Sequence, residues 1–132
     1  MFAWIKNLLG KRNPLPPPEP AKRRMKTYQA DSGYVYQYVF EGRHCLGGET
    51  EFIFSVSANR KRYERAIITI PNASLAPYEQ NLGRRLAENE RYGVAKIALF
   101  YLFDAQDRPE GVASGAVVTP AMAEKYLSVL GI

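Results

Sequence analysis

The chain has 132 residues, of which 46% are hydrophobic, 23% charged and 12% aromatic, with one cysteine and a formal net charge of +5. This length fits one modest domain, or a smaller domain with a tail. The composition excludes a wholly disordered chain, a collagen-like fibre and a disulfide scaffold, and no apolar run approaches the roughly 18 residues that a membrane-spanning helix needs.

Residues 1–12 form an N-terminal segment, in which residues 2–12 have the pattern of a short amphipathic helix. Apolar residues recur at spacings that place them on one helical face, and polar and basic residues supply the other. So short a helix is marginal in isolation, so we expect a partner surface to stabilise it. The residues expected to dock on that surface are Phe2, Trp4, Ile5, Leu8, Leu9, Lys11 and Arg12.

Residues 13–25 predict a stiff, proline-rich linker, because proline lacks an amide donor and favours an extended chain. Pro14 to Pro17 also fits a PxxP ligand. The basic run Lys22, Arg23 and Arg24 follows, and we expect it to join the docking surface.

Charge is concentrated in this N-terminal region. Residues 1–26 carry seven basic side chains and one acidic side chain, whereas residues 27–132 carry eleven basic and twelve acidic ones. The net charge of the first part is therefore +6 and that of the second is −1. Such asymmetry indicates a tail that meets an anionic surface, either lipid or nucleic acid, and the alternative is a tail that only aids solubility.

The folded domain is predicted to span residues 26–132. Its first half is dense in β-branched and aromatic residues, which are typical of strands, with glycine-containing turns between them. Gly33 supplies the positive φ of the first turn, and the glycines at 42, 47 and 48 bracket a loop. The predicted strands are 26–30, 34–41, 51–58 and 63–70.

The sequence also predicts the sidedness of the last of these hairpins, that is, which side chains share one face of it. Phe52, Phe54 and Val56 share one face, and they meet the apolar face of the next strand only if the loop has an odd length. A three-residue loop of Arg60, Lys61 and Arg62 satisfies this condition. The sequence therefore predicts a hairpin with an apolar face and a basic tip.

After Pro71 the pattern becomes helical. Ser74 is expected to cap a short helix that tolerates Pro77 in its first turn and stops at Gly83. A longer helix is predicted over 88–104, with an acidic first turn and a fully buried second half, 98–103.

The C-terminal part predicts a loop at 107–111, an edge strand at 112–118 and a last helix. Thr119 is placed to cap that helix, with Pro120 at its first position. Its inward residues are expected to be Ala123, Tyr126, Leu127 and Leu130.

Strands followed by helices indicate an α+β fold. We expect an antiparallel sheet of 3–5 strands with about three helices packed on one face, preceded by the N-terminal segment and the linker. The core is expected to unite Phe52, Phe54, Ile68, Leu99 and Leu127.

The side chains that catalysis and metal binding use are scarce. His44 and Cys45 are the only residues of their types, and as neighbours in an extended segment they would point to opposite faces. Cys45 is expected to be a small buried apolar residue. No phosphate-binding, hydrolase or zinc motif is present. We therefore expect no metal, no cofactor and no catalytic residues.

An aromatic ladder, Tyr34, Tyr36, Tyr38 and Phe40, is the most distinctive pattern of the domain. It has two interpretations. A core ladder packs against helices, whereas an exposed ladder stacks bases or docks a partner. The core interpretation is favoured because large apolar faces are seldom left in water.

These observations favour a non-catalytic interaction domain, cytoplasmic and peripheral to a membrane, whose N-terminal segment binds an anionic membrane surface or a protein partner. The alternative is an RNA- or single-stranded nucleic-acid-binding module, and an enzyme is the third choice. The residues expected to contact nucleic acid or other anions are Arg43, Arg60, Lys61, Arg62 and Arg65, together with the basic tail.

Overall fold

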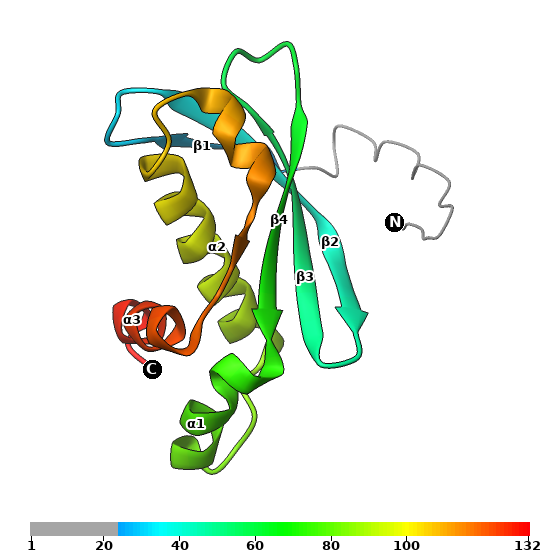
Figure 1. Ribbon diagram of the computed structural model, residues 1–132, viewed down its shortest axis with the longest axis vertical. Coiled ribbons are helices and arrows are strands. Elements are labelled where there is room, and N and C mark those ends of the chain that lie inside the picture. The colour runs from blue at the N-terminus through cyan, green and yellow to red at the C-terminus, as the bar shows by residue number, and fades with distance from the viewer. Residues whose placement is uncertain (1–23) are drawn as a thin grey trace.

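The computed structural model describes residues 24–132, which form an α+β fold built on one five-stranded sheet (Figure 1). None of the helices in this described part is long and apolar enough to cross a membrane. In chain order the elements are β1 (Lys26–Gln29), β2 (Val35–Leu46), β3 (Glu49–Ser57), β4 (Glu64–Pro71), α1 (Asn72–Leu82), α2 (Glu88–Asp104), the 3-10 helix η2 (Pro109–Ser114), β5 (Ala116–Val117) and α3 (Pro120–Leu130).

The strands lie in the sheet in sequence order, from β1 to β5. The first four pair antiparallel, whereas β5 pairs parallel with β4. The expected antiparallel sheet is thus a mixed one. A parallel neighbour requires a crossover connection, and the chain between β4 and β5 supplies it through α1, α2 and η2.

The β3–β4 hairpin has the predicted sidedness but a longer loop. Phe52 lies opposite Ile68 and Phe54 opposite Ala66, so the apolar sets share one face. The predicted three-residue loop is wrong, because β3 ends at Ser57 and β4 begins only at Glu64. Seven residues separate the last pair, Val56 and Glu64, and this odd number preserves the faces.

Strand β2 continues past the predicted end at Glu41 and includes the segment expected to be a loop. A β-bulge at Glu41 shifts the pairing between Phe40 and Gly42, and Gly42 adopts a φ of 143°, which favours glycine. Beyond the bulge the side-chain alternation is reversed. Arg43 therefore lies opposite the buried Phe52, on the side of the sheet that the helices cover.

The helices cover one face of the sheet (Figure 1). Helix α2 runs beneath the strands, and α3 packs against both α2 and α1. The buried cluster includes Phe52, Phe54, Ile68, Leu99 and Leu127, as predicted. We call the opposite side of the sheet the outer face, and no helix of residues 24–132 packs on it.

Helix α2 has the predicted bounds, and its N-terminus shows why. The Glu90 carboxylate accepts a hydrogen bond from the Ala87 N–H at 2.7 Å and forms a bidentate ion pair with Arg84. These bonds satisfy a backbone donor that the first helical turn leaves unpaired. The second half is not buried all round, because Tyr101 is exposed and lies under the Lys125 ammonium.

Several local predictions are corrected. Helix α1 begins at Asn72 rather than after Ser74, whose hydroxyl instead donates to the Val118 carbonyl at 2.7 Å. Pro77 therefore lies inside the helix rather than in its first turn. The expected loop and edge strand at 107–118 form the 3-10 helix η2 and the two-residue strand β5.

The helix ends of the C-terminal half follow the sequence more closely. Gly83 ends α1 in the left-handed conformation, as predicted. Thr119 caps α3 by accepting the Met122 N–H. Of the expected inward stripe of α3, only Leu130 is exposed.

Candidate functional site

The basic tip, which consists of Arg60, Lys61 and Arg62, projects from the β3–β4 loop. All three residues are exposed, as predicted, and none forms an ion pair within residues 24–132. Arg60 has a positive φ of 66°, uncommon for a residue other than glycine. The tip therefore presents three cations to solvent.

Two polar side chains hold this loop in shape. The Asn59 Oδ1 accepts the N–H groups of Lys61 and Arg62, both at 2.9 Å, and the Ser57 hydroxyl oxygen accepts the Arg60 N–H at 2.8 Å. Such side-chain bonds to nearby backbone replace the ladder bonds that a turn lacks. The position of the tip is thus set by Ser57 and Asn59.

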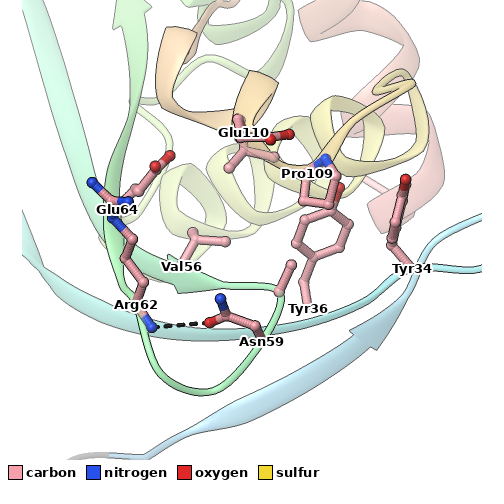
Figure 2. A pocket seen from close by; sticks show the side chains of 10 residues that line it. Tyr34, Tyr36, Val56, Asn59, Arg62, Glu64, Pro109 and Glu110 are labelled. Atoms are coloured by element: carbon pink, nitrogen blue, oxygen red, sulfur yellow. Dashed lines mark hydrogen bonds between the residues drawn. The ribbon is translucent and has the colours of Figure 1, made fainter.

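A pocket of about 330 Å³ lies between this loop and η2. We call it the Tyr36 pocket. Figure 2 shows Tyr34, which directly precedes β2, and Tyr36 of β2 rising toward Pro109, with Arg62 and Glu64 on the other side. Its walls thus come from β2, the β3–β4 loop and η2. Its lining residues are Tyr34, Tyr36, Val56, Ala58, Asn59, Arg62, Glu64, Pro109, Glu110 and Val112.

Two arginines of the predicted anion site lie outside the basic tip, Arg43 and Arg65, and neither lines this pocket. Arg43 lies beyond the bulge and pairs with Glu88 at the start of α2. It is therefore at the end of β2 away from the basic tip. Arg65 is exposed and lies opposite Ser55, on the outer face. The predicted five-residue cluster is consequently split into three places.

The aromatic ladder belongs largely to the core. Tyr36 and Tyr38 are buried, and the Tyr36 ring stacks on Phe103 of α2 with centroids 4.3 Å apart. The two ends of the ladder, Tyr34 and Phe40, are 37% and 38% exposed. The ladder therefore offers no continuous stacking platform for bases, which removes one support for the nucleic-acid interpretation.

His44 and Cys45 both lie in β2 and are turned to opposite sides of the sheet. His44 lies opposite Glu51, with the His44 Nδ1 3.8 Å from a carboxylate oxygen, and Cys45 lies opposite Thr50. The prediction that Cys45 is buried is wrong, since it is exposed. No group of three or more His, Cys, Asp or Glu side chains in residues 24–132 is placed to hold a metal ion.

Cys45 lines a second hollow, of about 450 Å³, which sequence reasoning missed. Arg43, Arg85 and Arg91 also contribute to it. Arg91 is buried, and its guanidinium is bound to Glu79 at 2.9 Å and to the Leu86 carbonyl at 3.3 Å. Arg91 therefore links α2 to Glu79 of α1.

The predicted docking segment lies mostly outside the described residues. This applies to Phe2, Trp4, Ile5, Leu8, Leu9, Lys11, Arg12, Lys22 and Arg23, whereas Arg24 is described and exposed.

The two carboxylates of the Tyr36 pocket were also missed by sequence reasoning. Glu64 and Glu110 are separated by 46 positions, and nothing in their neighbourhoods marks them as partners. The one available signal was Tyr36, which belongs to the predicted aromatic ladder and whose hydroxyl is buried in the structure.

Comparison with known proteins gives no further guide to function. The chain matches no protein-family model, no curated protein and no solved structure.

Proposed function

We propose that this protein is a non-catalytic interaction domain that its N-terminal segment holds at an anionic membrane surface. The observation that carries the proposal is the separation of charge, with +6 in residues 1–26 and −1 in the rest. An apolar segment gives only reversible attachment, and a second, electrostatic signal makes that attachment useful. The amphipathic segment and the basic run supply these two signals.

The domain supports this proposal in two ways. The described residues form a buried cluster of their own, which runs from Ala30 to Leu127. Its outer face also carries apolar side chains that no described helix covers. Ile53 and Ile67 lie opposite each other there and are half-buried, and Val117 is 57% exposed. Such a face suits a protein partner.

The test compares binding of the full chain to vesicles of mixed phosphatidylserine and phosphatidylcholine with binding to phosphatidylcholine alone. Each basic residue near an anionic bilayer contributes about 1 kcal/mol, so replacing Lys22, Arg23 and Arg24 with serine is expected to weaken binding on the order of a hundredfold. Replacing the basic tip, residues 60–62, with serine removes the same charge elsewhere and should leave vesicle binding unchanged.

The apolar signal is tested separately. Replacing Leu8 and Leu9 with serine is expected to release the protein from vesicles although all charges are intact. The matched control replaces the exposed Leu82 and Leu130 with serine and should leave vesicle binding unchanged. Raising the salt concentration should also release it, because the Debye length is about 8 Å near 0.15 M. If the full chain does not bind anionic vesicles at low salt, the membrane proposal is contradicted. A groove on a partner protein is then the docking surface for the N-terminal segment.

Nucleic-acid binding remains a second candidate because the basic tip is exposed and unpaired within the described residues. The serine variants of residues 22–24 and of residues 60–62 distinguish membrane binding from nucleic-acid binding. Loss of RNA binding in the variant of residues 60–62, with vesicle binding unaffected, would favour the nucleic-acid function.

A further inference from the structure

The Tyr36 pocket contains a buried polar atom without a partner. Tyr36 is 0% exposed, and its hydroxyl has no hydrogen-bond partner among residues 24–132. Buried polar groups are nearly always bonded, so an exception points to a missing partner. The residue also lines the pocket between the β3–β4 loop and η2, where Figure 2 shows its ring directed toward Pro109.

The pocket around this hydroxyl is acidic. Its charged lining residues are Glu64, Glu110 and Arg62, which leaves one net negative charge. Burial first, and then the nearby Tyr34 and Glu110, raise the pKa of Tyr36. The hydroxyl therefore remains protonated and neutral, with oxygen lone pairs that can accept a hydrogen bond.

The mouth of the pocket adds an aromatic surface. Tyr34 is 37% exposed, and its ring centroid is 6.4 Å from that of Tyr36. Aromatic faces attract ammonium and guanidinium groups, most strongly where water is excluded.

We propose that the Tyr36 pocket binds the cationic group of a basic side chain. Glu64 and Glu110 act as the counter-charges, and the Tyr36 hydroxyl oxygen accepts one N–H bond. Tyr34 covers the bound cation at the mouth. This interaction goes beyond the membrane attachment proposed above, since it belongs to the folded domain and not to residues 1–23.

An anionic ligand fits the same lining less well. A nucleotide phosphate would approach two carboxylates, and the only cation of the lining, Arg62, is exposed at the loop. Arg62 therefore has opposite effects on the two ligand classes. It repels a cation from the pocket, whereas it would attract a phosphate.

The experiment follows binding of N-acetyl-arginine amide and N-acetyl-lysine amide to the full chain by NMR titration. The two probes distinguish guanidinium from ammonium, N-acetyl-norleucine amide is the neutral control, and uridine monophosphate is the anionic one. At least one cationic probe is expected to bind at millimolar concentrations and to shift the resonances of residues 109–112.

The decisive variants are Tyr36→Phe and Arg62→Ser. Tyr36→Phe removes only an oxygen without a partner, so it should fold, and it is expected to weaken cation binding about tenfold, the cost of a hydrogen bond to a charged group. Tyr78→Phe, on α1, is the matched control and should leave cation binding unchanged. Arg62→Ser should strengthen cation binding severalfold because it removes the like charge.

Three results overturn the proposal. The first is that neither cationic probe binds the full chain. The second is that Tyr36→Phe binds as tightly as the unaltered chain. The third is that uridine monophosphate binds in the pocket and Arg62→Ser weakens it, which would assign the pocket to nucleotides.

Discussion

Replacing Leu99 with alanine tests the packing of α2 against the sheet. Leu99 is 0% exposed and lies in the cluster that joins the strands to α2 and α3. The substitution removes three buried carbon groups at roughly 0.8 kcal/mol each, about 2.4 kcal/mol in all. The cavity adds to this loss unless the surroundings collapse, so the free energy of unfolding is expected to fall by about 2.5–5 kcal/mol.

Urea unfolding followed by circular dichroism measures this change. The denaturation midpoint should fall while the slope of free energy against urea stays constant, because the variant unfolds from the same compact state. Asn89→Ala is the control on the same helix, since Asn89 is exposed, and it should change stability by less than about 0.5 kcal/mol. A loss that small for Leu99→Ala would mean that the buried face of α2 is assigned wrongly.

Three further predictions concern the surface. Replacing residues 60–62 with serine should leave the melting temperature within a degree or two, because the tip is solvated and its bonds to Asn59 come from backbone N–H groups, which serine retains. The bonds to Arg84 and to backbone lower the pKa of Glu90 from 4.5 to about 2, so stability from this carboxylate is present above pH 4.5 and is lost as the pH falls toward 2. In Glu90→Gln the melting temperature should accordingly depend less on pH between 4.5 and 2. An unchanged pH dependence would contradict the role of the Arg84–Glu90 ion pair. The exposed Cys45 should react with a maleimide in the native protein, and protection until unfolding would show that it is buried.

Predictions from local chemistry succeeded where one segment contains its own signals. The bounds of α2 follow from the acidic first turn and the apolar run, and the cap of α3 follows from Thr119 and Pro120. The sidedness of the β3–β4 hairpin follows from side-chain alternation alone. In the two helix cases the deciding interactions lie within a few residues of one another, and in the hairpin they join two neighbouring strands.

Predictions failed where distant segments decide the outcome. Ser74 is a good capping residue, but its hydroxyl bonds the Val118 carbonyl, 44 positions away. The bulge at Glu41, which alternation does not reveal, sets the side of the sheet to which Cys45 turns. The Tyr36 pocket likewise needs η2 to approach the β3–β4 loop, and only the tertiary fold brings these parts together.

The bulge at Glu41 also allows the length of β2 to change by one residue in evolution. Deleting the codon of Glu41 would restore regular pairing, and the residues beyond it would keep their partners, with Arg43 opposite Phe52 and His44 opposite Glu51. The ladder from Tyr36 to Phe40 would keep its register, because it precedes the deletion. The bulge thus holds one additional residue in β2 without changing which side chains face the helices.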